Sequence, residues 1–287
     1  MGSPPAAPLS AVLQRAAARL AAAGVDDPRR DAELLVLHVL AREPAFLYAH
    51  PETVLTVAEQ AAFDLLLTAR VRRVPMQYLT GTQEFYGRPF AVSPAVLIPR
   101  PETELVVEAA LGLLRATPAP TCVDVGTGSG CVAITLALER PDARVIAVDR
   151  SMAALAVARD NARRLGAVVG WSTGDLLAAL PADALQLVIS NPPYIGADEC
   201  AALPPEVRDN EPGMALFAGP RGDEIHARLV PQARQVLRPG GWLVLEIGCS
   251  QGAALRALLA TWDAVEVRAD LQGLDRIVVA RKPGAKP

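Results

Sequence analysis

Residues Asp124–Gly130 read DVGTGSG, and they end a short apolar run, CVDVG, that is predicted to be a β-strand. The run SGCVAITLALER at residues 129–140 follows at once and has the composition of a helix. Glycines at such a junction let the backbone turn tightly and approach a ligand closely, while free N–H groups at the helix start face that ligand. The stretch therefore predicts a ligand-binding strand–loop–helix unit.

Strands and helices alternate outward from this loop to the end of the chain. Alternation of this kind predicts a mostly parallel sheet covered by helices on both faces. The tail at residues 264–282 offers two strands around a glycine-containing turn, which is typical of an antiparallel edge. The predicted fold is α/β, a Rossmann-like sheet of seven strands. The clearest strands are expected at residues 122–126, 144–149, 185–191 and 240–248.

The N-terminal part of the chain has a different pattern, with apolar residues at three-to-four residue spacing. We expect a small helical domain at residues 1–73 that docks the substrate, and His38 falls on its predicted apolar face. Residues 74–99 alternate aromatic and β-branched side chains around a turn, which predicts a β-hairpin linker. Residues 100–287 then form the catalytic domain, starting with a helix at Pro101.

Composition limits the class of protein. Hydrophobic residues make up 51% of the 287 residues and charged residues 21%, which is typical of a globular protein. A net charge of -3 disfavours a partner held through phosphates, so direct binding of nucleic acid is not expected. Four scattered cysteines and three histidines show no metal-ligand spacing, and no metal site is predicted. Without a signal peptide or an uninterrupted apolar span, we expect a cytoplasmic monomer with no membrane contact. Clustered arginines, Arg70, Arg72 and Arg73 among them, are predicted to form a solvated helix face.

A carboxylate completes the predicted cofactor site. Asp149 ends the next strand, the usual place for a carboxylate that grips ribose hydroxyls. Cys131 stands where the dinucleotide pattern GxGxxG needs glycine or alanine, and the loop instead resembles the GxGxG of class I methyltransferases. That resemblance implies S-adenosylmethionine, with S-adenosylhomocysteine as product. Asp175 and Leu176, after the third strand, are expected near its adenine. The predicted cofactor-binding residues are Gly126, Thr127, Gly128, Ser129, Gly130, Asp149, Asp175, Leu176 and Asn191.

The tetrapeptide Asn191-Pro192-Pro193-Tyr194 directly follows the strand LQLVIS and is predicted to be catalytic and substrate-binding. Prolines fix φ and keep the preceding residue extended, so two acceptors converge: the Asn191 side-chain oxygen and the Pro192 carbonyl. An –NH2 group has two donors to meet them. A conjugated nitrogen is a poor nucleophile, and holding both N–H bonds orients it and favours the charge that develops on it. Tyr194 is expected to pack its ring against the flat substrate.

The motif (D/N/S)-P-P-(Y/F) is shared with amino-methylating DNA enzymes, so other segments decide the substrate. Residues 97–104 read LIPRPETE, after QYLTG at 77–81 and EF at 84–85. Together with DVGTGSG, AVDRS and SNPPYI, they resemble the HemK/PrmC family, the glutamine-N5 methyltransferases of peptide chain release factors. The resemblance covers residues 74–280. It implies methylation of the glutamine of the Gly-Gly-Gln loop, with class 1 release factors as partners.

Two other substrates remain open at this point. One is a glutamine of a ribosomal protein, although those relatives have a different segment in place of RPETE. The other is adenine N6 of DNA, which would require a basic target-recognition region that residues 10–73 do not offer. The sequence does not assign roles to Arg100 and Glu102.

Overall fold

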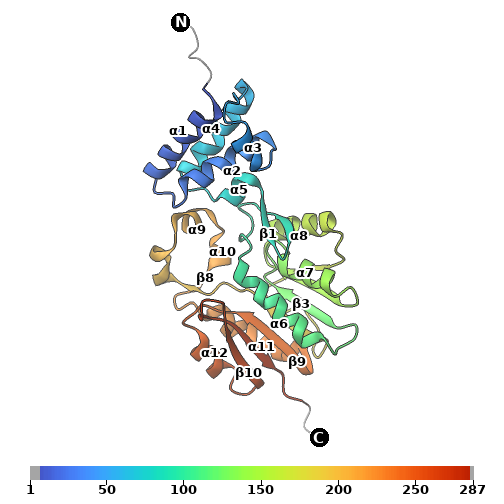
Figure 1. The fold of residues 1–287 in the computed structure, drawn as a ribbon. Helices are drawn as coiled ribbons and strands as arrows, with labels where there is room; N and C mark the ends of the chain where they lie inside the picture. The colour runs from blue at the N-terminus through green and yellow to red at the C-terminus, as the bar shows by residue number, and fades with distance from the viewer. Residues whose placement is uncertain (1–6, 285–287) are drawn as a thin grey trace. The chain divides into compact units, whose positions relative to one another are not determined.

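The computed structural model describes residues 7–284, which form two compact units. The first unit runs to Gly81 and also includes Pro204–Asn210, which lie far along the chain. The second unit comprises Thr82–Leu203 and the residues from Glu211 onward. Figure 1 colours the chain from blue at the first helices to red at the last strands. Of the predicted linker at residues 74–99, residues 74–81 belong to the first unit, and residues 82–99, which include the hairpin, belong to the second.

The first unit is built from helices around one apolar core. The predicted helical character of the N-terminal region is confirmed. Leu13, Leu35 and Phe63, from three different helices, are at most 2% exposed in that core. The helices are α1 Leu9–Ala22, α2 Pro28–Leu40, α3 Ala45–Ala49, α4 Val57–Val71, α5 Met76–Thr80 and α9 Pro205–Asn210.

Local capping explains where the longer helices begin. Pro28 takes the first position of α2, and the Asp27 side chain accepts a hydrogen bond from the backbone N–H of Arg30. Helix α4 begins with a capping box, in which Thr56 and Glu59 satisfy each other's backbone N–H groups. These caps fix the first residues of α2 and α4.

The prediction for His38 is wrong, because its side chain is exposed. The face of α2 that enters the core carries Ala32, Leu35 and Val36, all fully buried. The buried face of α2 thus points away from His38, and Leu34 is 39% exposed. A helical period alone does not decide which of two adjacent leucines faces inward.

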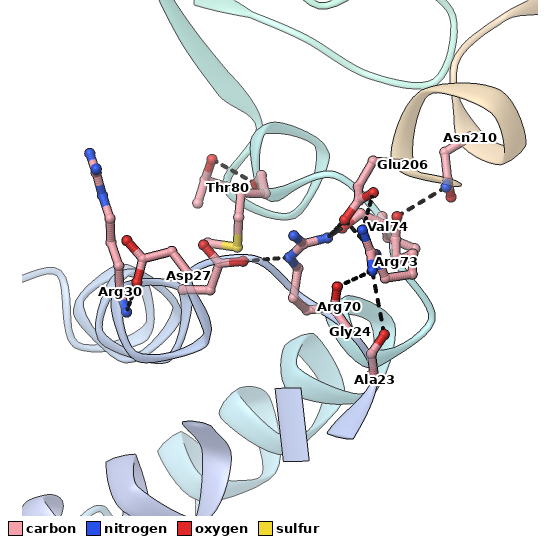
Figure 2. A network of polar contacts seen from close by, with 12 residues as sticks. Ala23, Gly24, Asp27, Arg30, Arg70, Arg73, Val74, Thr80, Glu206 and Asn210 are labelled. Atoms are coloured by element: carbon pink, nitrogen blue, oxygen red, sulfur yellow. Dashed lines mark hydrogen bonds and ion pairs between the residues drawn. The ribbon is translucent and has the colours of Figure 1, made fainter. Parts of the chain in front are cut away.

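A buried ionic network joins α9 to the end of α4, and Figure 2 shows it. Arg70 donates to Asp31 Oδ2 from Nε at 2.6 Å and to Glu206 Oε1 from Nη1 at 2.9 Å. Arg73 grips both oxygens of Glu206, at 2.6 and 2.7 Å. The Asn210 side chain donates to the carbonyl of Arg73 at 3.1 Å. The prediction of a solvated arginine face is wrong for Arg70, which is 7% exposed, while Arg72 is exposed.

The second unit contains a seven-stranded sheet in the order β10-β11-β9-β6-β3-β4-β5. The five strands from β9 to β5 are parallel, and β11 and β10 form an antiparallel edge. The predicted sheet, its strand number and its antiparallel edge are confirmed. The strands are β3 Thr121–Val125, β4 Arg144–Asp149, β5 Gly170–Thr173, β6 Leu185–Ser190, β9 Leu237–Glu246, β10 Asp263–Ala269 and β11 Asp275–Arg281.

Helices cover both faces of this sheet because the strands are apolar on both sides. One apolar cluster packs α6 Glu104–Leu114 and α7 Cys131–Glu139 against the sheet, and the other packs α11 Glu224–Val236 and α12 Gly252–Leu258. The remaining elements are α8 Met152–Leu165, α10 Gly213–Leu216, the 3-10 turns Pro101–Thr103 and Ala197–Ala202, and the short strands β7 Ile195–Gly196 and β8 Phe217–Gly219.

The predicted hairpin is formed by β1 Thr82–Phe85 and β2 Arg88–Ala91, which pair antiparallel. Its turn places Tyr86 at φ 52°, and the Tyr86 N–H donates to the Glu104 side chain at 2.7 Å. Within residues 7–284, no helix combines the length and the apolar character needed to cross a membrane.

Candidate active site

The glycine loop connects the carboxyl end of β3 to α7, as predicted. Gly126, Gly128 and Gly130 have φ values of 70°, 55° and 82°, a region that disfavours side chains. A Cβ on Gly126 would meet no described atom within 4 Å, whereas one on Gly130 would lie 2.8 Å from the Ile134 side chain. The first glycine therefore borders open space, and the third allows α7 and α8 to pack closely.

The polar side chains of the loop turn inward, away from that open space. Thr127 is 4% exposed and donates to Asp124 Oδ2 at 2.6 Å, an atom that also accepts from the Ala133 N–H at 3.2 Å. Ser129 is 2% exposed, and its carbonyl accepts from the Asn161 side chain at 2.9 Å. The side chains of Thr127 and Ser129 thus shape the loop, and the loop backbone stays available to a ligand.

Asp149 lies at the end of β4, beside the loop. Its Oδ2 accepts from the Gly128 N–H at 3.0 Å and its Oδ1 from the Ser151 N–H at 2.8 Å. Each carboxylate oxygen has two acceptor positions, so both oxygens keep one for a ligand hydroxyl. The pattern connects the carboxylate rigidly to the glycine loop.

A cavity opens at the carboxyl ends of these strands, where α/β sheets bind ligands. The cavity is partly open to solvent, and residues from several strand ends line it. Its walls include Gly126, Gly128, Asp149, Asp175, Leu176, Asn191 and Pro193, together with Val96, Leu97, Met214 and Ile225. The structure thus brings most of the predicted site residues together, and the others, which adjoin them in sequence, are not among the lining residues: Thr127, Ser129, Gly130, Pro192 and Tyr194.

Asp175 and Leu176 follow β5 at the far side of the cavity. Asp175 is exposed and forms an ion pair with Arg228, a residue that sequence reasoning did not identify. Leu176 adopts φ 55°, which is unusual for a residue with a side chain and places it on the cavity wall. Apolar packing by Leu176 and a polar contact by Asp175 therefore stay available to a ligand.

The Asn191–Tyr194 tetrapeptide begins directly after β6, beside β3. Asn191 Nδ2 donates to Thr103 Oγ1 at 3.0 Å, and the Tyr194 hydroxyl donates to Glu246 Oε1 at 3.3 Å. The Tyr194 carbonyl accepts from the Gln251 side chain at 3.0 Å. Burial raises the pKa of the Tyr194 hydroxyl above its usual value, so this group stays protonated. The motif is held at both ends.

Two residues at this site, Thr103 and Glu246, were missed by the sequence reasoning. Glu246 ends β9, is 1% exposed and accepts from the Thr103 hydroxyl at 2.7 Å. A charged residue in the apolar run LVLEIG was the available signal, since glutamate is rarely buried without a partner. Burial raises the pKa of Glu246 to about 7, although Thr103 and Tyr194 donate to it.

Arg100, whose role the sequence left open, forms an ion pair with Glu211. The Glu211 side chain is fully buried, and its other oxygen accepts from the Ile98 N–H at 3.1 Å. These contacts bind the IPRPE segment to the chain just before α10. Arg100 therefore anchors a loop. Among residues 7–284, no three His, Cys, Asp or Glu side chains are grouped so that they could hold a metal ion.

We expect Asp124→Asn to change how stability depends on pH. Burial raises the pKa of Asp124 to about 7 from 3.8, so the native state retains a proton that the unfolded chain releases. Its stabilising contribution is complete below the unfolded pKa and is lost as pH rises through about 7. The wild type should lose on the order of 1 kcal/mol per pH unit more than the variant between about pH 5 and pH 7. Asparagine keeps an acceptor for Thr127, so urea unfolding at several pH values isolates the charge; parallel stability curves would contradict the assignment.

Comparison with known proteins agrees with this geometry. The chain matches the PrmC N-terminal domain family over residues 11–81 and the Methyltransferase small domain family over residues 105–202. It is 46% identical over 276 residues to the release factor glutamine methyltransferase of Koribacter versatilis, covering 96% of this chain and 99% of that protein. The proteins of the same name from Nitratidesulfovibrio vulgaris and Cereibacter sphaeroides are 44% and 47% identical, over 98% and 95% of this chain and 97% and 98% of their own length.

The chain belongs to the release factor glutamine methyltransferase family.

The family membership confirms the HemK/PrmC resemblance inferred from LIPRPETE and SNPPYI. Among solved structures, the hMettl16 catalytic domain has a TM-score of 0.58 at 17% identity, covering 76% of this chain and 83% of that one. A methyltransferase from Pyrococcus furiosus has a TM-score of 0.50 at 16% identity, covering 69% and 91%. At such identities the likeness concerns the fold alone, and it confirms the class I methyltransferase fold.

Proposed function

We propose that this member of the release factor glutamine methyltransferase family transfers a methyl group from S-adenosylmethionine to the side-chain amide nitrogen, N5, of a glutamine. The glutamine is that of the Gly-Gly-Gln loop of class 1 peptide chain release factors. The observation that carries the proposal is the position of Asn191: it lines a cavity bordered by the glycine loop and Asp149. The names of the relatives supply the substrate.

The residues around the cavity suit the cofactor. The open space beside Gly126 lets a ligand approach the backbone, and Asp149 offers free acceptor positions to ribose hydroxyls. Leu176 can pack against an adenine face, and Asp175 can accept from its amino group. When bound, the cofactor supplies an electrophilic methyl group on a sulfonium, and the product is S-adenosylhomocysteine.

The remaining chemistry belongs to the substrate amide. Its nitrogen lone pair is delocalised into the carbonyl, so the nitrogen needs orientation and stabilisation of the charge it acquires. We expect the Asn191 side-chain oxygen, which lines the cavity, and the Pro192 carbonyl next to it to accept its two N–H bonds. Forming the N–C bond leaves one surplus N–H proton, which departs to water. Pro193 keeps the peptide stiff, and Tyr194 supports it through Glu246.

We expect Asp149→Ala to weaken cofactor binding by roughly tenfold to a hundredfold, because a charged acceptor to a ligand contributes about 1.5–3 kcal/mol. Calorimetric titration with S-adenosylmethionine measures the dissociation constant directly. Asp160→Ala is the matched control, since Asp160 on α8 is half-buried, is not among the residues that line the cavity, and pairs with Arg163 and Arg164 of the same helix. An Asp149→Ala protein that binds as tightly as the wild type would refute the ribose contact.

The test of the function is methyl transfer from labelled S-adenosylmethionine to three substrates offered side by side. They are purified class 1 release factor, the same factor with its loop glutamine changed to alanine, and duplex DNA. Label on the unaltered factor alone supports the proposal, and label on DNA would refute the substrate while leaving the cofactor assignment in place.

A further proposal concerns the helical unit, which we assign the role of docking the factor. A short peptide carrying the Gly-Gly-Gln loop lacks any surface for that contact. Comparing kcat/KM for the peptide and the intact factor therefore measures what docking contributes, and equal values would remove this role. The proposal further implies a monomer acting in the cytoplasm, where translation terminates.

A further inference from the structure

A buried chain of hydrogen bonds leads from Glu246 to the proposed catalytic amide. Glu246 and Thr103 are 1% and 2% exposed, and they come from the end of β9 and from the turn before α6. Thr103 Oγ1 lies 2.7 Å from Glu246 Oε2 and 3.0 Å from Asn191 Nδ2. Three segments that are distant in sequence therefore meet at one hydroxyl.

The direction of these bonds follows from counting protons. A threonine hydroxyl has one proton to donate, and an ionised carboxylate can only accept. When Thr103 donates to Glu246, it can only accept from Asn191, so the NH2 group of Asn191 must face Thr103. The side-chain oxygen of Asn191 is then left for the cavity that this residue lines. No hydrogen bond reaches that oxygen within the part of the chain that the structure describes.

We infer that Thr103 and Glu246 are positioning residues, which hold the Asn191 amide with its oxygen toward the substrate nitrogen. An asparagine amide is nearly symmetric in shape, so packing alone does not distinguish its oxygen from its nitrogen. In the opposite orientation, the NH2 group of Asn191 would face the –NH2 group of the substrate, and two hydrogen-bond donors would meet. The inference rests on the proposed function, because the required orientation is the one that an incoming –NH2 group needs.

The protonation state of Glu246 sets the direction in which the hydrogen bonds from Glu246 through Thr103 to Asn191 are donated. Tyr194 donates to its other oxygen, and Arg276 on β11 favours its charge, while Glu102 opposes it. His226 on α11 meets only the backbone carbonyl of Glu246, and burial lowers the pKa of this histidine, which keeps it neutral. Burial dominates and raises the pKa of Glu246 to about 7. A protonated Glu246 can donate to Thr103, which frees the threonine proton to turn to Asn191 and reverse its amide.

The expected kinetic result separates this role from a structural one. Thr103→Val keeps the shape and removes the hydroxyl, and we expect kcat on release factor to fall about tenfold, the worth of one hydrogen bond. Cofactor affinity by calorimetry should stay unchanged, and Thr103→Ser should restore kcat. In the wild type, kcat should decline as pH falls through about 7, and Thr103→Val should lose that decline.

The matched control is Thr135→Val. Thr135 is also a fully buried threonine of this unit, and its hydroxyl has no hydrogen-bond partner among the described residues. This variant should keep wild-type kcat and the wild-type pH profile. A Thr103→Val enzyme that behaves in the same way would overturn the inference.

If the Thr103→Val protein does not fold, Glu246→Gln provides the test instead. Glu246→Gln can present either its oxygen or its NH2 group to Thr103, so it no longer dictates the direction of the chain. We expect a lower kcat without a decline near pH 7, and wild-type kcat with the decline intact would again overturn the inference. A failure of the proposed function would look different, because the wild type itself would then leave the release factor unlabelled.

Discussion

Asn191→Ala is expected to lower kcat for methyl transfer to release factor by roughly a hundredfold to a thousandfold, the usual cost of removing one group that stabilises the transition state. Alanine removes the side-chain oxygen that would accept an N–H bond of the substrate amide. It leaves the backbone after β6, and with it the carbonyl of Pro192, in place. Single-turnover transfer of label from S-adenosylmethionine is the measurement, because it reports the chemical step.

The loss should appear in kcat and much less in cofactor binding. Asn191 is one of many residues on the cavity wall, whereas Gly126 and Asp149 provide the proposed main contacts. An interaction made only in the transition state lowers kcat and kcat/KM together. Asp160→Ala, on α8 and not among the residues that line the cavity, serves as the control and should leave transfer unchanged. Near wild-type transfer by Asn191→Ala would remove the proposed mechanism.

Arg70→Met is expected to destabilise the helical unit by about 3–5 kcal/mol, the usual cost of breaking a buried ion pair from one side. Arg70 is 7% exposed and Asp31 9%, so the carboxylate of Asp31 would lose its partner while buried. Glu206 would keep Arg73. Urea unfolding is followed by far-UV circular dichroism, which includes the helices of this unit, and by tryptophan fluorescence, which reports the other unit because all three tryptophans lie there. The loss of stability should appear in the circular dichroism and not in the fluorescence.

Arg72→Met is the control for that experiment, since Arg72 is exposed at the C-cap of the same helix and its replacement should change the unfolding free energy by less than about 0.5 kcal/mol. The double variant Arg70→Met with Asp31→Leu should recover most of the loss, because no buried charge is left unpaired. Equal unfolding free energies for Arg70→Met and Arg72→Met would contradict the network drawn in Figure 2.

The sequence predicted the sheet and the main part of the site because both depend on local patterns. An apolar strand followed by DVGTGSG, a carboxylate ending the next strand and NPPY ending another can be identified one segment at a time. The carboxyl ends of neighbouring parallel strands meet at one edge of a sheet, so Asp149 and Asn191 had to lie close to Gly126. The comparison with relatives then confirmed the family that SNPPYI and LIPRPETE indicated.

What the sequence missed depends on contacts between distant segments. Thr103 looked like part of a helix start and Glu246 like part of a strand, and only the folded chain brings them to Asn191. That the side chains of Thr127 and Ser129 are buried was also out of reach, because a loop sequence does not reveal which side chains turn inward. Glu206 lies more than a hundred residues from Arg73, so no local pattern could have paired them.

The central claim is that the methyl group is placed on one particular amide nitrogen, and mass spectrometry of the product tests it most directly. Release factor is incubated with the enzyme and S-adenosylmethionine, digested, and its loop peptide is fragmented. We expect the mass of one methyl group on the side chain of the Gly-Gly-Gln glutamine and on no other residue, with no addition when Asn191→Ala replaces the wild type. A methyl group on another residue, or an unmodified loop beside full cofactor turnover, would contradict the account.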